Sequence, residues 1–195
     1  MACTTYLTGF STSCGSNLPS VKKLYIGTFE SANFTYTYQQ DGEGQDVLDA
    51  DGNKIIESVS GATLNSGADN WVEFQFRKNS SSMDIEMTVN DNGSHFYTNS
   101  ATCVFAKIEN SKRLALESVA SGECTMIILD SNNQYWLIGR ENPVSLTTLS
   151  GSTGTAIGDS NQYSVTLSAD EPTMPVLIER DQAQTIINTL LGIGE

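Results

Sequence analysis

Residues 132–179 have the sequence NNQYWLIGRENPVSLTTLSGSTGTAIGDSNQYSVTLSADEPTMPVLIE, and the predicted fold starts from this stretch. Aromatic and branched residues at 134–138 follow the turn dipeptide Asn132-Asn133, a pattern typical of a strand that leaves a tight turn. An isolated pair of strands is marginal in water because it buries too little apolar surface. We therefore expect the strands of this stretch to lie on a larger β-sheet.

The second half of the stretch predicts a long hairpin arm over residues 144–168. Pro143 interrupts the preceding strand, and two strand-like runs, 144–149 and 162–168, flank a segment rich in Gly, Ser and Thr. The two runs can pair antiparallel, and the glycines between them favour a loose tip. The arm is expected to project from the body of the protein.

Length and composition favour one mostly β domain over residues 1–195. A chain of 195 residues is long enough to bury a substantial core. Hydrophobic residues make up 38% of the chain and charged residues 17%, while Ser, Thr, Asn and Gly are abundant. This composition is typical of strands and turns rather than of helical bundles or disorder. The predicted fold class is all-β or α+β.

The clearest alternation lies in residues 71–78 (WVEFQFRK) and 83–90 (MDIEMTVN). Apolar side chains occupy one face of each run and polar side chains the other. We expect the two runs to pair as an antiparallel hairpin with one buried and one solvated face. The solvated face carries Glu73, Asp84 and Glu86.

Further strands are expected at residues 22–29, 33–39, 54–59 and 95–108, and two short helices complete the prediction. The first helix is expected at residues 111–121, with Ser111 as its N-cap. The second is expected at 181–191 and ends before Gly192. It carries an apolar stripe that must be buried, formed by Ala183, Ile186, Ile187, Leu190 and Leu191.

The net charge of −13, from 23 acids and 10 bases, argues against a nucleic-acid grip. Such a grip requires Lys and Arg to neutralise phosphates. By itself, an acidic surface of this kind keeps a protein soluble.

The cysteines favour reduced thiols over a metal site. Cys3, Cys14, Cys103 and Cys124 lack the paired spacing of zinc ligands, and His95 is the single histidine. Cys103 and Cys124 lie in apolar runs and are expected in the core. Cys3 and Cys14 lie in a polar leader, residues 2–20, where a disulfide remains an alternative. The leader lacks the basic and apolar regions of a signal peptide, so we expect a cytoplasmic origin and no membrane span.

No other cofactor or catalytic site is predicted. The run DADGN at residues 49–53 is similar in composition to part of a calcium-binding loop. The twelve-residue spacing and the terminal Glu of such a loop are missing, so a turn is favoured. His95 lies beside a turn without an identifiable nucleophile, and the glycine runs GEG and GSTG lack the Lys of a phosphate loop. We expect a protein that is not an enzyme.

The run GTAIGDSNQYSVTL at residues 154–167, with Glu171-Pro172 and Pro175 after it, resembles the closing segment of tail-tube and neck ring proteins of tailed bacteriophages. The run DSNNQYWLIG at residues 130–139 is similar to the same family. These relatives come from phages of gut Bacteroidota, including crAss-like phages. The resemblance covers roughly the last third of the chain and includes no catalytic signature.

The resemblance implies an antiparallel β-sandwich or half-barrel with flanking helices and a projecting hairpin. It implies a virion protein of the tail or neck, assembled in the host cytoplasm into a homo-oligomeric ring or tube that forms part of the DNA ejection channel. Its partners would be its own copies, neighbouring tail, neck or portal proteins, and genomic DNA that passes without specific binding. Two sets of site residues follow: a lumen face with Glu73, Asp84 and Glu86, and an inter-subunit arm with Gly151, Thr153, Gly154, Ile157 and Gly158.

The alternative function is a β-sandwich binding module of the adhesin or receptor-binding type. Such a module would present Tyr and Trp from its loops to a glycan or a protein. Here Trp71 and Trp136 lie in strand-like runs and are expected to pack in the core. The sequence therefore favours assembly over binding.

Overall fold

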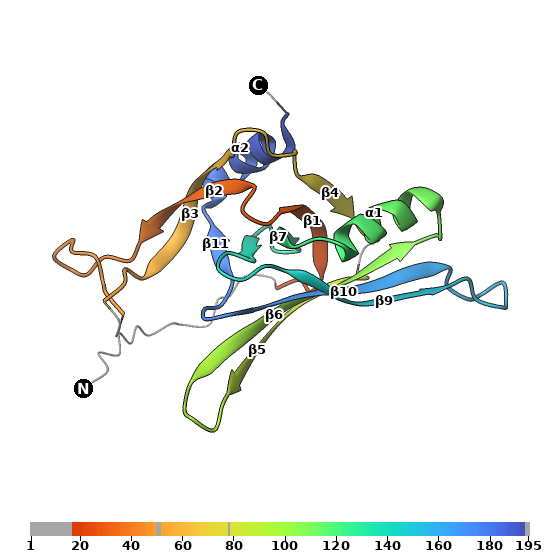
Figure 1. Cartoon of the computed structure of the whole chain (residues 1–195), viewed down its shortest axis with the longest axis horizontal. Helices are drawn as coiled ribbons and strands as arrows, with labels where there is room; N and C mark the ends of the chain where they lie inside the picture. Colours follow the sequence, from red (N-terminus) through yellow and green to blue (C-terminus); the bar gives the residue numbers. More distant parts are fainter. Residues whose placement is uncertain (1–16, 50–51, 78, 194–195) are drawn as a thin grey trace.

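Two β-sheets pack face to face in the computed structural model, which describes residues 17–49, 52–77 and 79–193 (Figure 1). The seven-stranded sheet contains, in spatial order, β2 (Ala32–Tyr38), β3 (Ile56–Leu64), β11 (Val176–Ile178), β8 (Tyr135–Ile138), β7 (Cys124–Asp130), β1 (Val21–Thr28) and β4 (Val72–Gln75). The four-stranded sheet contains β5 (Ser82–Val89), β6 (His95–Ala106), β10 (Gln162–Glu171) and β9 (Ser145–Ser152). All neighbouring strands are antiparallel except β11 and β3.

This arrangement confirms the predicted mostly β, α+β sandwich. Both sheets are open, so the fold is not a closed barrel. Helix α2 (Arg180–Leu191) covers the side of the seven-stranded sheet that faces away from the four-stranded sheet (Figure 1). Helix α1 (Asn110–Ala120) lies beside β9 and adds Leu116 to the core between the sheets.

Strand β7 is buried on both faces. Met126 and Ile128 point into the cluster between the two sheets, whereas Ile127 and Leu129 point toward α2. The four-stranded sheet contributes alternate residues to the first cluster, including Cys103 of β6 and Val165 of β10. A strand buried on both faces requires a continuous apolar run, which CTMIILD supplies.

The thiols expected in the core lie there. Cys103 and Cys124 are both buried and unpaired. Burial raises the pKa of Cys103 to about 12, so the neutral thiol is its form at physiological pH. Cys3, Cys14 and most of the leader lie outside the described residues.

The expected helices differ in how well their ends were predicted. Helix α2 begins one residue before the predicted start, and its stripe of Ala183, Ile186, Ile187 and Leu190 is buried, with Leu191 packed at the margin. Gly192 ends it in the left-handed conformation, at φ 65°. For α1 the predicted Ser111 cap is wrong. The N-cap position is Glu109, which makes no side-chain capping bond.

The predicted hairpin between residues 71–78 and 83–90 is wrong. Strand β4 pairs with β1 at the edge of the seven-stranded sheet, and β5 pairs with β6 in the other sheet. The connection between them therefore crosses from one sheet to the other. Alternation correctly predicted which side chains share a face within each strand. It did not predict the pairing, because β4 and β5 each pair with a longer strand, β1 and β6, and not with each other.

Local turn chemistry was more predictable than strand pairing. The turn at Asn132-Asn133 is confirmed, since Asn133 adopts φ 62° and donates its backbone N–H to Asp130 at 3.2 Å. The three-residue strand β11, between β3 and β8, was not predicted. It follows two prolines, Pro172 and Pro175, and three residues are too few to show a periodic pattern.

Gly27 in β1 provides a test of the packing. A Cβ at this position would lie 2.1 Å from the indole Nε1 of Trp71, which is buried and donates a hydrogen bond to Ser31 Oγ at 3.0 Å. We expect Gly27→Ala to destabilise the fold by about 1–3 kcal/mol, because the indole cannot move away without losing that bond. Urea denaturation measures the change. The control is Gly42→Ala, whose added Cβ meets no atom within 4 Å; equal stability of the two variants would contradict the described contact.

Candidate functional site

The four-stranded sheet has one face packed on the core and one face directed outward, and the outward face is the candidate site. Because side chains alternate along a strand, every second residue of β5, β6, β10 and β9 points away from the core. The pairing places these residues in rows that cross the sheet. We call this surface the outer face, and its rows include Ser82–Thr102–Thr166–Thr148, Asp84–Ser100–Ser168–Ser145, Glu86–Thr98–Asp170 and Val104–Ser164–Ser150.

Hydroxyl groups dominate the outer face. Some of them bond to one another or to neighbouring groups, as in the contact of 3.5 Å between Thr102 Oγ1 and Thr166 Oγ1. Ser82 Oγ donates to Asp84 Oδ2 at 2.9 Å, and Thr98 Oγ1 donates to Asp170 Oδ1 at 2.6 Å. The face is therefore polar and hydrated, with few apolar side chains.

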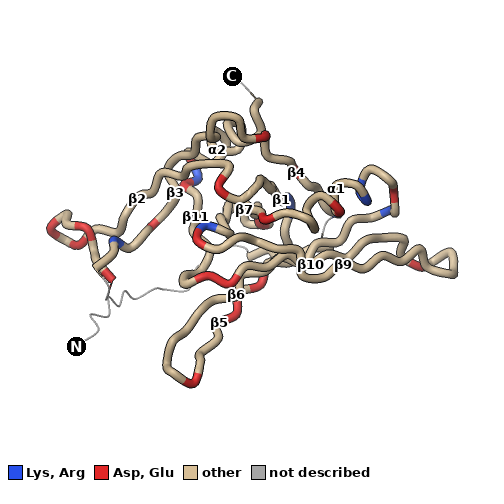
Figure 2. The backbone as a smooth tube through the Cα atoms, in the orientation of Figure 1, with Lys and Arg blue, Asp and Glu red and all other residues tan. Residues whose placement is uncertain are grey.

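All formal charge on the outer face is negative. Its carboxylates are Asp84, Glu86 and Asp170, and the four strands contain no Lys or Arg. Figure 2 shows this asymmetry, with acidic positions and no basic ones along β5, β6, β10 and β9. Of the predicted lumen residues, Asp84 and Glu86 lie together on this face.

Glu73 lies elsewhere, which corrects the prediction that it shares a wall with Asp84 and Glu86. It belongs to β4, opposite Tyr25 of β1, on the side of the seven-stranded sheet that faces α2. Lys23 Nζ lies 2.9 Å from its carboxylate and neutralises it. Asp170 was missed by sequence reasoning, although the alternation of Gln162, Ser164, Thr166 and Ser168 already pointed to its face.

The outer face ends at two edge strands, β5 and β9. Within the described residues, neither has a second partner strand, so each offers a row of backbone groups for pairing. The β5–β6 hairpin also extends beyond the seven-stranded sheet (Figure 1). On its core-side face Ile85, Met87 and Val89 are therefore 43%, 55% and 61% exposed, whereas the alternation predicted that they would be buried.

The hairpin arm predicted at residues 144–168 is confirmed as the β9–β10 pair (Figure 1). Of the predicted arm residues, Gly151 lies in β9 opposite Tyr163, and the others lie in the tip between the strands: Thr153, Gly154, Ile157 and Gly158. Ile157 is fully exposed, which is unusual for a large apolar side chain.

The tip of the arm is held by hydrogen bonds, in contrast to the loose tip expected from its glycines. Asp159 Oδ2 accepts the backbone N–H groups of Thr155 at 2.7 Å and Ala156 at 2.8 Å. The bond from Ala156, followed by that from Thr155, lowers the pKa of Asp159. Gly154 adopts φ 71°, and a Cβ there would meet Asp159 at 2.2 Å. The tip is thus a preformed loop that presents Ile157.

Glu171 at the end of β10 connects the two sheets. Its carboxylate, 4% exposed, accepts the backbone N–H groups of Gly139 at 3.2 Å, Arg140 at 2.8 Å and Glu141 at 3.3 Å, all from the segment after β8. Asn99 Nδ2 donates a further bond at 3.1 Å. A buried carboxylate is tolerated when it accepts several such bonds. Its role here is structural.

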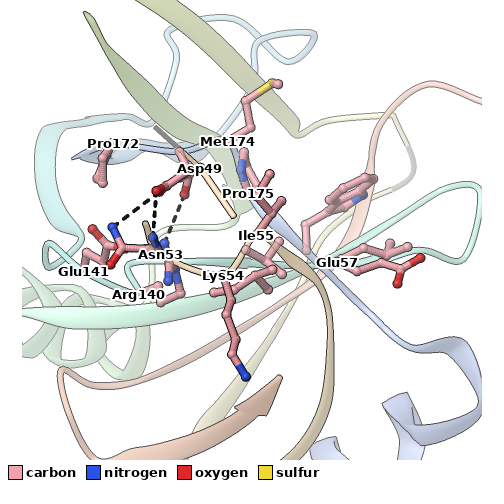
Figure 3. A pocket seen from close by; sticks show the side chains of 15 residues that line it. Asp49, Asn53, Lys54, Ile55, Glu57, Arg140, Glu141, Pro172, Met174 and Pro175 are labelled. Atoms are coloured by element: carbon pink, nitrogen blue, oxygen red, sulfur yellow. Dashed lines mark hydrogen bonds and ion pairs between the residues drawn. The ribbon is translucent and has the colours of Figure 1, made fainter. Parts of the chain in front are cut away.

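A hollow of about 590 Å³ lies between β3, β8 and the β10–β11 connection (Figure 3). Four of its charged side chains are engaged with neighbours: Arg140 with Glu141, Lys54 with Asp46, and Asp49 with the backbone and side-chain amides of Asn53. Glu57, which is exposed, also lines the hollow. The described lining residues include no Ser, Cys or His.

The described part of the chain also offers no metal centre. No three His, Cys, Asp or Glu side chains among residues 17–49, 52–77 and 79–193 converge as metal ligands. Asp49 and Asn53 form a hydrogen-bonded turn, while residues 50 and 51 of the calcium-like run lie outside the described ranges. His95 is exposed, and its ring lies edge to face with the ring of Tyr97. Among the described helices, none has the length and apolar character to cross a membrane.

Comparison of the chain with protein-family models, curated proteins and solved structures gives no match. The function must therefore be argued from the geometry of the outer face, its edges and the arm.

Glu171 is a testable part of this scaffold. We expect Glu171→Gln to destabilise the protein by about 1–3 kcal/mol, because the amide would turn an NH₂ group toward backbone donors and leave buried N–H groups unpaired. The matched control is Asp170→Asn, the same change one residue earlier on the exposed outer face, with an expected effect within about 0.5 kcal/mol. Urea unfolding compares the two, and a Glu171→Gln variant as stable as the control would contradict the assigned role.

Proposed function

We propose that this protein is a structural subunit of a tailed-phage virion that assembles into a ring or tube in the tail or neck and lines part of the DNA ejection channel. The observation that carries the proposal is the outer face. It is broad, rich in hydroxyl groups and charged only by Asp84, Glu86 and Asp170. The resemblance of residues 130–139 and 154–167 to tail-tube and neck ring proteins supports the same function.

The chemistry of the outer face suits a channel through which DNA slides. Binding to DNA draws most of its strength from Lys and Arg that neutralise phosphates, and this face has none. Carboxylates repel the phosphate backbone, while Ser and Thr hydroxyls keep the wall hydrated and make no strong, sequence-specific contact. A genome would pass such a wall without being retained.

The edges of the sheet suit closure into a ring. If β5 of one copy pairs with β9 of the next, the four-stranded sheets join into one continuous sheet. Such a contact is head to tail, so it closes into a ring when the rotation between copies allows it. A closed ring leaves no unpaired edge on the inner sheet. In such a ring the next copy would also cover Ile85, Met87 and Val89, which are exposed in the single chain. Exposed apolar side chains that lie together mark contact surfaces of this kind.

The β9–β10 arm is assigned to contact between subunits. Its tip projects beyond the body of the protein and presents Ile157 on a loop held by Asp159 (Figure 1). A preformed loop loses little conformational entropy when it binds. The arm would clasp a neighbouring copy, or a tail, neck or portal protein that lies above or below the ring.

The aromatic side chains weigh against the binding-module alternative. Trp71 is buried, and Trp136 packs against the core between the sheets. An adhesin would need such residues exposed in its loops.

Electron cryomicroscopy of the purified protein tests the proposed function. The proposal predicts rings or tubes with an axial pore wide enough for duplex DNA. A protein that stays monomeric at every concentration would contradict it.

The charge of the outer face gives a direct functional prediction. We expect assembled wild-type protein to show no measurable retention of duplex DNA, and Asp84→Lys/Glu86→Lys to bind it at least about tenfold more tightly, in a strongly salt-dependent way. Both side chains are exposed, so the fold should persist. Filter binding or fluorescence anisotropy over a salt series measures the effect.

The matched control carries the same change in net charge away from the outer face. Glu57→Lys/Glu123→Lys alters one exposed residue on β3 and one before β7. We expect this variant to retain no more DNA than the wild type. Equal DNA binding by both double variants would assign the effect to net charge and contradict the role of the outer face.

The arm gives a second prediction. Replacement of residues 153–160 by Asn-Gly would join the strands by a three-residue connection that ends in Asn161, because Ser152 already pairs with Gln162. We expect the variant to fold, since these residues lie outside both core clusters, but to assemble at least about tenfold less readily, because interface anchors of this kind contribute strongly to binding. Circular dichroism checks the fold and sedimentation velocity the assembly. Assembly equal to that of the wild type would exclude the clasp.

A further inference from the structure

The two edges of the seven-stranded sheet differ in charge. Strands β2 and β3 form one edge, and the connection between them extends to one end of the molecule (Figures 1 and 2). Strand β4, next to β1, forms the opposite edge. A contact between these two edges in different copies would be head to tail, the geometry that builds rings and filaments.

A pocket at the β1–β4 edge carries only positive charge. It has a volume of about 430 Å³ and lies where the chain enters β1 and leaves β4. Its apolar lining includes Leu18, Val21 and Phe76, and its charged residues are Lys22 and Arg77. We call it the cationic pocket.

The two cations of this pocket are exceptional in an acidic protein. Among the described residues, the ion pairs engage Lys23, Lys54, Lys107, Lys112, Arg113 and Arg140. None of these ion pairs includes Lys22, Arg77 or Arg180. Lys22 Nζ donates to the neutral amide of Asn133 at 2.6 Å, and Arg77 is exposed. Two of the three described cations without a carboxylate partner thus line one pocket.

The opposite edge carries a matching acidic loop, residues 40–49, with Asp41, Glu43, Asp46 and Asp49 and no base. Asp41 Oδ1 accepts the backbone N–H groups of Glu43 and Gln45, each at 2.9 Å, so the loop is preformed. Glu43 lies exposed at its tip between two glycines. Leu48, half-exposed, adds an apolar side chain to the same loop.

We infer that the acidic loop of one copy docks in the cationic pocket of the next copy, with Glu43 facing Arg77 and Lys22. This inference rests on the proposed ring. There the four-stranded sheets join at the channel wall, and the docking contact joins the seven-stranded sheets. Charge complementarity selects this occupant, because the pocket lacks acids and the loop lacks bases. The apolar lining of the pocket offers a surface for Leu48.

A charge swap tests the contact on the full chain. We expect Arg77→Glu and Glu43→Arg each to raise the protein concentration needed for ring assembly at least about tenfold, since each places like charges opposite one another. The double variant Arg77→Glu/Glu43→Arg restores opposite charges and should assemble at close to the wild-type concentration. Arg180→Glu is the matched control, because it reverses an exposed cation on α2 outside the pocket. Sedimentation velocity over a concentration series measures all five proteins.

The outcomes separate this contact from the proposed function. Wild-type rings with single variants that assemble normally would overturn the contact and leave the channel function intact. Weakened single variants without recovery in the double variant would also overturn it, because the two residues would then act on different partners. A wild-type protein without any rings would instead contradict the proposed function.

Discussion

The structure depends on the burial of strand β7 on both faces. Met126, Ile127 and Ile128 are completely inaccessible to solvent, and successive side chains point to opposite layers. One set forms the core between the two sheets, and the other forms the core under α2. Both clusters therefore share this strand as their common wall. Its burial matters for stability because burial of apolar surface is the main favourable term in folding. The positions of the four-stranded sheet and of α2 follow from it.

The four-stranded sheet uses only one face for this core, which leaves the chemistry of the other face unconstrained by packing. The residues on this outer face are mainly Ser and Thr, with three carboxylates. Glu171 holds the end of β10 to the segment after β8, so the outer face keeps a defined orientation relative to the rest of the protein. The surface proposed to meet DNA is therefore supported by a rigid layer and not by loops.

In the proposed ring, assembly and channel chemistry would depend on the same strands. Strands β5 and β9 bound the outer face and also expose the unpaired edges, and their hairpins carry the exposed residues Met87 and Ile157. In a monomer these features are liabilities for aggregation. In the proposed ring they would become contacts, and the acidic wall would form only where several copies place their outer faces side by side.

The sequence by itself determined which side chains share a face, because a strand has a period of two and an amphipathic helix a period of 3.6. The burial of Cys103 and the stripe of α2, and the shared face of Asp84 and Glu86, all follow from local alternation. Only the tertiary structure decided that Glu73 joins another sheet, that Asp170 completes the outer face, and that Ile85 stays exposed. The physical reason is that strand pairing and burial depend on partners far along the chain, and alternation carries no information about which partner a strand will find.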